Sequence, residues 1–394
     1  MKRLTRYVLF EMLAVFLITL LAMTVLMVLV GIVRQAVREG MGVGPVLKMI
    51  PFALPEALRF SVPATILLAA CTVFGRMAAD NEIVAIKSLG ISPRVLFVPV
   101  LVLGLMMSIV AVWLNDMAVT WGREGIYRVA MESLEQIVYG VLRTQKSYIT
   151  KRLSIVVKGV DGHRLVEPFI SIYPNDSEEP ITISARFAEL TGDAQQGILR
   201  ITLQNGVLQH GEYTYEFNES HEFKVPLTDV HRKGGPVKRA SDVALNQLGD
   251  QRRLEQNQLL ALQQRMAETA AIQLATGGLD QISGPLWDEQ LTQWNSGADR
   301  LNRLTVEPWR RWANGFSCYF FVFVGAPLAV KMRTTNFFTT FAACFLPILF
   351  IYYPLMTYTV DQAKDGLVPA CGVWAGNLVL AGVGSWLMRD VMRH

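Results

Sequence analysis

The segment Arg76–Arg94, with the sequence RMAADNEIVAIKSLGISPR, is a short charged stretch between two strongly apolar runs. Asp80 or Asn81 suits a helix N-cap, Gly90 suits a helix end, and Pro93 suits the first turn of a following helix. This spacing predicts about two turns of helix in the loop between the apolar runs.

The predicted loop helix carries one carboxylate on an apolar stripe. Glu82, Ile86 and Leu89 stand at i, i+4 and i+7, so they share one helix face. One interpretation is a helix that rests on lipid headgroups with Glu82 solvated. The other is a docking helix for a cytoplasmic partner that brings a basic group to Glu82. The residues alone leave both interpretations open.

The apolar runs on either side indicate the fold class. Of the 394 residues, 52% are hydrophobic and only 18% are charged, and the mean hydropathy is +0.31. Runs of about 20 apolar residues can cross a hydrocarbon core, which predicts an integral membrane protein. The first run is too long for the apolar part of a cleaved signal peptide, so we expect it to remain as a span. The predicted spans are Val8–Val33, Leu58–Phe74, Val95–Leu114, Trp312–Val330, Phe337–Tyr358 and Val368–Met388.

The first part of the polar region between the third and fourth spans has the pattern of β-strands. Its short segments are rich in β-branched and aromatic residues, and turn signals such as Gly162, Gly192–Asp193 and Asn205–Gly206 separate them. Because no helix-connected parallel pattern occurs, an antiparallel sheet is favoured. The predicted strands are Ser147–Thr150, Leu153–Lys158, Ile181–Leu190, Ile198–Gln204 and Tyr213–Val225.

The second part, about Ala244–Leu304, is glutamine-rich and predicts a helical hairpin. Gly277–Gly278 interrupts its helical pattern, and Pro285 opens a second helix that carries Trp287 and Trp294 on one face. These tryptophans are interpreted as the packing core of the hairpin. The predicted domains are residues 1–114 for three spans with a loop helix at about 80–90, 115–243 for the sheet, 244–308 for the hairpin, and 309–394 for three further spans.

Basic residues predict the orientation in the membrane. Placing the N-terminus, the Arg76–Arg94 loop, Lys331–Arg333 and the C-terminal tail in the cytoplasm collects most of the short-loop Lys and Arg there. The polar region then lies on the outer side. The basic residues that depart from this bias are Arg34, Arg38, Lys48 and Arg310–Arg311.

The sequence lacks the motifs of common catalytic sites. GxxxxGK[ST], HExxH and GxSxG are absent, and the four cysteines lie in apolar runs without metal-ligand spacing. His163, His210 and His221 are interpreted as surface or hydrogen-bonded residues. No enzyme activity, cofactor or metal is therefore predicted, and a net charge of +4 does not favour a nucleic-acid partner.

The energy source of any transport is predicted to lie in a partner. Apart from Glu11, near one end of the first predicted span, the spans lack ionisable groups at mid-depth. Transporters coupled to protons or sodium need such groups. The helix around Glu82 is the candidate receiver of that partner.

The run Pro51–Leu96, PFALPEALRFSVPATILLAACTVFGRMAADNEIVAIKSLGISPRVL, resembles the second-span and loop signature of the LptF/LptG lipopolysaccharide-export permeases. That signature has spaced prolines, an apolar span, a basic residue, an Asn-Glu pair and Gly-Ile-Ser before the third span. ISARFAEL followed by LRITLQNGVLQ is similar to paired strands of the family's periplasmic β-jellyroll, and Gly325–Leu328 and Trp374–Asn377 also fit. The long glutamine-rich segment and Ala375–Gly376 depart from the family pattern.

The resemblance implies six transmembrane helices in a 3+3 arrangement with an inserted periplasmic antiparallel β-jellyroll, in the bacterial inner membrane. Such a permease pairs with a second LptF/LptG-type subunit and binds a dimeric cytoplasmic ABC ATPase. It draws lipopolysaccharide from the inner membrane and passes it to a periplasmic jellyroll bridge protein. Membrane lipids surround it. The implied ATPase-coupling residues are Arg76, Asn81, Glu82, Ile86 and Leu89, with Glu82 transmitting ATPase closure to the spans.

A substrate with phosphates and acyl chains needs an apolar cavity with cations at its outer rim. We expect Arg34, Arg38, Arg310 and Arg311 to supply this rim, because guanidinium groups make forked contacts with phosphate. The alternative is that these arginines anchor the protein to anionic headgroups.

Two other functions remain open from the sequence. One is the permease of another lipid or lipoprotein ABC exporter, and the other is a membrane-anchored scaffold or sensor with a ligand-binding sheet. Co-purification of an ATPase separates the transport functions from the last one.

Overall fold

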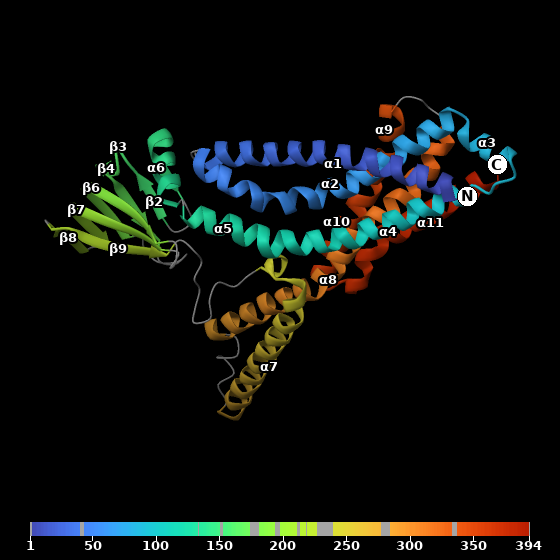
Figure 1. The fold of residues 1–394 in the computed structure, drawn as a ribbon. Coiled ribbons are helices and arrows are strands. Elements are labelled where there is room, and N and C mark those ends of the chain that lie inside the picture. The colour runs from blue at the N-terminus through green and yellow to red at the C-terminus, as the bar shows by residue number, and fades with distance from the viewer. Residues whose placement is uncertain are drawn as a thin grey trace. The chain divides into compact units, whose positions relative to one another are not determined.

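The computed structural model describes residues 2–39, 43–132, 134–149, 153–173, 181–193, 198–210, 213–217, 219–226, 239–276, 284–332 and 337–393 (Figure 1). The chain divides into two compact units. The helical unit comprises Met1–Val25, Pro55–Thr120 and Lys238–His394, and the sheet unit comprises Leu26–Leu54 and Trp121–Val237. Each unit is described by itself.

The membrane-spanning helices follow the apolar runs of the sequence. The described residues contain six helical stretches that are long and apolar enough to cross a bilayer, which confirms the six-span prediction. These stretches are Arg3–Gly31, Leu47–Ala79, Arg94–Ile126, Trp287–Met332, Thr339–Lys364 and Ala370–Arg393. The helices that form these stretches include α1 (Lys2–Glu39), α2 (Val43–Ala79), α4 (Arg94–Met117), α8 (Pro285–Met332), α9 (Phe337–Pro347), the π-helix η4 (Ile348–Tyr352), α10 (Tyr353–Lys364), the 3₁₀-helix η5 (Ala370–Trp374) and α11 (Ala375–Arg393). The short helix α3 (Glu82–Ser88) lies in the loop between α2 and α4.

Small residues let these helices pack closely. A Cβ atom on Gly315 of α8 would lie 2.3 Å from a methyl carbon of Val112 on α4, so only glycine allows this approach. Asn377 of α11 donates from its side chain to the carbonyl oxygen of Ala313 on α8 at 3.0 Å. Asn377 therefore joins two spans by a buried hydrogen bond.

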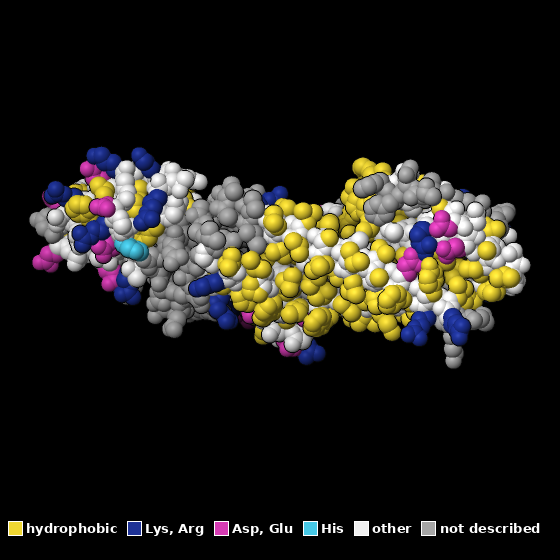
Figure 2. Space-filling view, turned by 45° about the horizontal axis from the view of Figure 1, so that its top comes forward, with side chains coloured by type: hydrophobic (Ala, Val, Ile, Leu, Met, Phe, Trp, Pro, Cys, Tyr) yellow, Lys and Arg dark blue, Asp and Glu magenta, His cyan; other side chains and the backbone are white. Residues whose placement is uncertain are grey.

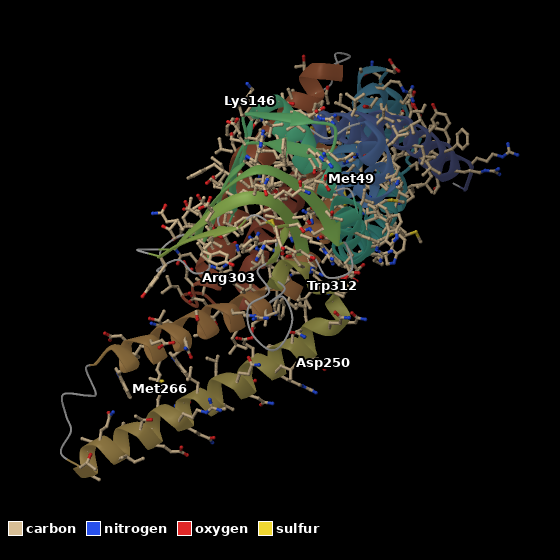
Figure 3. The ribbon with its side chains drawn as sticks, turned by 90° about the vertical axis from the view of Figure 1, so that its left-hand side faces the viewer. Met49, Lys146, Asp250, Met266, Arg303 and Trp312 are labelled. Carbon is tan, nitrogen blue, oxygen red and sulfur yellow. The ribbon has the colours of Figure 1, made fainter. Side chains whose placement is uncertain are left out.

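The glutamine-rich segment forms the predicted hairpin. Helix α7 (Leu245–Thr276) and the first part of α8 run side by side (Figure 3). Leu259 of α7 packs against Gly297 of α8, and Trp294 is half-buried. The predicted break at Gly277–Gly278 lies outside the described residues. Unexpectedly, α8 continues without interruption from the hairpin into the fourth span, with Pro308 inside the helix.

In the described part of the chain, the sheet unit contains an antiparallel sheet of nine strands, in agreement with the predicted sheet class. The strands are β1 (Ser147–Ile149), β2 (Leu153–Val156), β3 (Gly159–Asp161), β4 (Arg164–Val166), β5 (Phe169–Ile172), β6 (Ile181–Asp193), β7 (Ile198–His210), β8 (Tyr213–Phe217) and β9 (His221–Pro226). Leu165, Ile170, Ile201 and Leu203 are among its fully buried core residues. All of its strand pairs are antiparallel, and the sheet curls around this core.

The predicted turn at Asn205–Gly206 is a kink within strand β7, so this part of the prediction is wrong. Asn205 has a φ of 50°, and a Cβ atom on Gly206 would lie 2.6 Å from the carbonyl oxygen of Ser184. On one side of the kink β7 pairs with β9, and on the other side it pairs with β8. The left-handed residue that suggested a turn instead bends one long strand between two partners.

Three helical elements lie before the sheet where the sequence suggested none. The π-helix η1 (Ala118–Gly122) continues α4, and α5 (Arg123–Glu132) and α6 (Leu134–Gln145) follow it. Val138 and Leu142 of α6 are fully buried in the core of the sheet unit. Helix α6 thus covers apolar strand residues that would otherwise face water.

Candidate functional site

The loop helix α3 is present where the sequence predicts it. Asn81 precedes it in the left-handed conformation, with φ 58° and ψ 16°, and turns the chain sharply after α2. Its side chain makes no capping hydrogen bond. At the other end, Gly90 has a φ of 78° and its N–H donates to the Lys87 carbonyl at 2.9 Å. Two tight turns therefore fix α3 between α2 and α4.

Helix α3 has an inner face and an outer face. Ile83 is only 3% exposed, and Ile86 packs against the hydrophobic core of the helical unit. Val84 and Leu89 are 46% and 76% exposed. The predicted stripe of Ile86 and Leu89 is thus divided between the two faces. The outer face presents apolar side chains that have no packing partner in the core.

Arg76, at the end of α2, is the centre of an ion-pair network beside α3. Its guanidinium donates a fork to the two carboxylate oxygens of Glu11 on α1, at 2.9 and 2.7 Å, and a third bond to Glu82 at 3.0 Å. Asp80 lies 3.5 Å away, and the Tyr7 hydroxyl accepts at 3.1 Å. One side chain therefore connects α1, α2 and α3.

The network around Arg76 is partly exposed on the helical unit. Near the end that carries α3, a cluster of basic and acidic side chains interrupts a broad hydrophobic surface (Figure 2). The side chains of Arg76, Glu11 and Glu82 are 38%, 25% and 33% exposed. The three groups are thus partly shielded from water and partly exposed at the surface.

Two further contacts connect α11 to its neighbours at the α3 end of the helical unit. The Lys87 ammonium donates to the carbonyl oxygen of Val391 in α11 at 2.8 Å. The Lys331 ammonium, at the end of α8, pairs with Asp390 of α11 at 2.7 Å. Helix α3 is therefore linked to α11 as well as to α1 and α2.

The sequence indicated Arg76 and Glu82 as site residues, but it did not indicate the partners of Arg76 on α1. Glu11 and Tyr7 lie more than 60 residues away along the chain, at separations of 65 and 69 residues from Arg76. The available signal was a single carboxylate in the apolar first span, because such a charge needs a partner. The basic group expected to meet Glu82 from outside is matched within the chain by Arg76.

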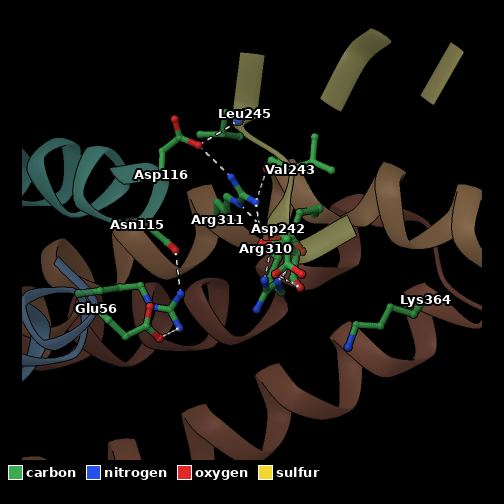
Figure 4. A network of polar contacts seen from close by, with 12 residues as sticks. Glu56, Asn115, Asp116, Asp242, Val243, Leu245, Arg310, Arg311 and Lys364 are labelled. Carbon is green, nitrogen blue, oxygen red and sulfur yellow. Dashed lines mark hydrogen bonds and ion pairs between the residues drawn. The ribbon is translucent and has the colours of Figure 1, made fainter. Parts of the chain in front are cut away.

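A second network lies around Arg311 of α8 (Figure 4). This guanidinium is fully buried and donates to Glu307 at 3.0 Å and to Asp116 of α4 at 2.9 Å. It also donates to the carbonyl oxygens of Ser241 and Val243, at 3.3 and 2.7 Å. Arg311 therefore holds the chain that enters the hairpin against two spans.

Asp116 and Glu307 extend this network. The same Oδ1 of Asp116 that accepts from Arg311 also accepts from the N–H of Leu245, the first residue of α7, at 2.9 Å, which satisfies a free donor at that helix start. Glu307 is 5% exposed and also accepts a forked contact from Arg310 at 2.9 and 2.6 Å. The base of the hairpin is thus fastened by paired charges.

The four arginines of the predicted rim occupy different settings. Arg311 is buried and donates to acceptors within the chain, whereas Arg310 is partly exposed and paired with Glu307. Arg34 is exposed on α1. Arg38 belongs to α1, but its side chain lies outside the described ones. Of the two rim arginines in the sheet unit, Arg34 is the one whose side chain is described, and it is exposed to solvent.

The two networks lie at different depths of the helical unit. On α8, Lys331 and Arg311 are separated by about 20 residues, which is about 30 Å of helix. On α4, Arg94 and Asp116 are separated by about 33 Å of helix. These lengths match the hydrocarbon thickness of a bilayer, about 30 Å. One network therefore lies at each boundary of the apolar layer.

The six spans and the inserted antiparallel sheet make this chain a multi-pass membrane protein. It belongs to the LptF/LptG family, because the family described as "Lipopolysaccharide export system permease LptF/LptG" matches residues 6–390, nearly the whole chain. A comparison with individual curated proteins finds no match. Membership of the family identifies the chain as a lipopolysaccharide-export permease.

Proposed function

We propose that this permease is driven by a separate cytoplasmic ABC ATPase dimer that docks on α3. The observation that carries the proposal is the division of α3 into two faces. Val84 of α3 and Leu89, which directly follows α3, are exposed, while Glu82 is hydrogen-bonded to Arg76 and through it to Glu11 of α1. A displacement of α3 by the ATPase would thus act on two spans through one guanidinium.

The charges around Arg76 support a basic group on the partner. Three carboxylates, those of Glu11, Asp80 and Glu82, lie within 3.5 Å of this single guanidinium. The cluster therefore keeps an excess of negative charge, and Asp80 is 53% exposed. A lysine or arginine of the ATPase near Asp80 and Glu82 would be attracted by this excess. Asn81 would shape the turn, and Ile86 would join α3 to the core.

We assign the α3 end of the helical unit to the cytoplasm. Exposed basic residues at that end include Arg3, Arg6, Arg94 and Arg389, as the positive-inside bias requires. The sheet and the hairpin then belong to the periplasmic side of the bacterial inner membrane. The proposed domains are 1–114, 115–243, 244–308 and 309–394. In this arrangement the sheet would pass lipopolysaccharide on to a periplasmic jellyroll bridge protein.

The first span supports pairing with a second LptF/LptG-type subunit. Only 11% of its most apolar 18-residue segment is buried within the chain, and Ile18 and Leu21 are 70% and 69% exposed. A related six-span subunit would cover part of this face, and the acyl chains of the substrate would contact the rest. The apolar cavity would thus form between the two permeases.

The phosphates of the substrate are proposed to meet Arg34 and Arg38 on α1. The double variant Arg34→Ala with Arg38→Ala is expected to lower lipopolysaccharide photo-crosslinking and export several-fold, because two cations are removed from the rim. The measurement compares crosslinking yields in cells at equal protein levels. Arg128→Ala, which removes another exposed arginine of the sheet unit, serves as the control.

Two results would argue against this rim. Unchanged crosslinking in the double variant would leave Arg34 and Arg38 as headgroup anchors only. A fall of equal size in Arg128→Ala would attribute the effect to general surface charge. Arg310 and Arg311 are left out of this test, because both are paired with Glu307 and their loss would disturb the helical unit itself.

A further inference from the structure

Helices α1 and α4 leave an apolar groove between them at the α3 end of the helical unit. Its volume is about 790 Å³. Leu9, Phe10 and Leu13 of α1 form one wall, and Val98 and Pro99 of α4 form part of the other. Phe10 and Val98 are 75% and 55% exposed, so the groove opens to the surroundings of the spans and not to a closed interior.

The groove exists because α1 uses another face for its packing. Val8, Met12 and Phe16, which follow one another at intervals of four residues, are buried in the core of the helical unit. Leu9 and Leu13 are turned toward the groove. The groove is thus a fixed feature of how α1 sits on the unit.

Two arginines also line the groove. Arg6 of α1 and Arg94 of α4 are exposed, and neither forms an ion pair with a carboxylate in the described part of the chain. Both helices begin at this end, at Lys2 and Arg94. Their N-termini add partial positive charge to that of the two guanidinium groups. The mouth of the apolar groove is therefore strongly electropositive.

The position of the groove fits a lipid and not a soluble anion. Arg94 lies at the same boundary of the apolar layer as Arg76, whereas Leu13 and Pro99 lie one to two turns deeper along their helices. Figure 2 shows basic side chains at the margin of the hydrophobic surface at this end. An occupant must thus be anionic at the boundary and apolar within the layer.

We propose that this groove binds an anionic phospholipid of the leaflet on the α3 side. The phosphodiester lies between Arg6 and Arg94, and one acyl chain fills the groove along Leu9, Leu13 and Val98. A zwitterionic lipid offers the same chain but no net charge, so it binds more weakly. The bound chain braces α1 against α4, beside the Glu11–Arg76 contact. This site does not depend on the cargo or on the ATPase.

The test uses the full-length protein in its purified complex and native mass spectrometry. Phosphatidylglycerol or phosphatidylcholine is titrated into the delipidated complex, and bound lipid is counted. The wild type is expected to retain phosphatidylglycerol at least fivefold better than phosphatidylcholine. Arg6→Ala with Arg94→Ala is expected to abolish this preference, whereas the control Arg3→Ala with Arg389→Ala keeps it. Both substitutions in this control replace exposed arginines that do not line the groove.

A second variant separates the groove from its charges. Val98→Trp fills the groove without changing charge, and it is expected to lower binding of both lipids. A photo-crosslinking residue at Phe10 is expected to capture lipid in the intact complex. Equal retention of both lipids by the wild type, or equal losses in the two double variants, would overturn the proposal. Capture of a protein at Phe10, with no lipid adduct, would assign the groove to a partner chain and overturn it as well.

Discussion

Replacement of Arg311 by alanine is expected to destabilise the helical unit by about 3–5 kcal/mol, the cost of breaking a buried ion pair from one side. The side chain of Arg311 is 1% exposed, and that of Glu307 is 6% exposed. Without the guanidinium, the buried Glu307 keeps only Arg310 as a cationic partner, and Asp116 keeps only the N–H of Leu245 among its described donors. The carbonyl oxygens of Ser241 and Val243 also lose their donor. Each buried acceptor that loses its donor adds a desolvation cost.

The measurement is the midpoint of thermal unfolding of the purified protein, followed by tryptophan fluorescence. Arg310→Ala is the matched control, because Arg310 pairs with the same carboxylate but its side chain is 28% exposed. It should shift the midpoint far less. Arg311→Lys should fail to restore stability, since one ammonium group cannot reproduce the planar fork toward Glu307 and Asp116. Similar shifts for Arg310→Ala and Arg311→Ala would contradict a special role for the buried residue.

The second large effect is expected at Arg76. In Arg76→Ala the direct link from Glu82 to Glu11 is lost, so movement of α3 no longer acts on α1 through charged contacts. We expect the ATPase to remain bound through the outer face of α3. ATP-driven release of lipopolysaccharide should nevertheless fall at least tenfold. Such a result would assign Arg76 to transmission and not to docking.

Reconstituted complexes measure the two steps separately, by ATPase co-purification and by ATP-dependent lipopolysaccharide release. Arg76→Lys should recover part of the release, because an ammonium group reaches one carboxylate at a time. Arg389→Ala, near the end of α11, controls for loss of another exposed cation at the α3 end of the helical unit. Release in Arg76→Ala within twofold of the wild type would contradict transmission through this side chain.

The spans could be predicted from the sequence because hydropathy is a local property. Each apolar run carries its own length and its own charged ends, and the six helical stretches lie where these runs occur. The helix after Asn81 was predictable for the same reason. Gly90 and Pro93 encode its end and the start of α4 within a few residues.

Other parts of the fold depended on contacts that the sequence does not show. Helices α5 and α6 contain many polar residues, and α6 is stabilised by burial of Val138 and Leu142 against the sheet. Asn205 has the conformation expected of a turn residue, but pairing with β6 on both sides keeps it in one strand. The predicted boundary between residues 308 and 309 lies inside α8, which continues through Pro308 into the fourth span.

The candidate site was predictable only in part. The sequence indicated α3 and its charged residues, because a carboxylate on an apolar stripe is unusual at a membrane surface. It could not indicate that Arg76 chooses Glu11, since no local rule pairs residues 65 positions apart. Nor could it separate Arg310 from Arg311, two neighbours of the same type. A helix turns by about 100° per residue, so one of them faces the core and the other does not.

If the proposed ATPase docks on the outer face of α3, the exposed Leu89 should form part of its interface. Leu89 is 76% exposed, and Leu367, in the loop between α10 and η5 at the other end of the spans, is 73% exposed. Because neither leucine packs in the core, Leu89→Glu and Leu367→Glu should both leave the fold intact. The measurement is the amount of ATPase that co-purifies with each variant at equal permease levels. We expect Leu89→Glu to lose at least nine-tenths of the ATPase and Leu367→Glu to retain it, whereas equal retention by both variants would contradict docking on α3.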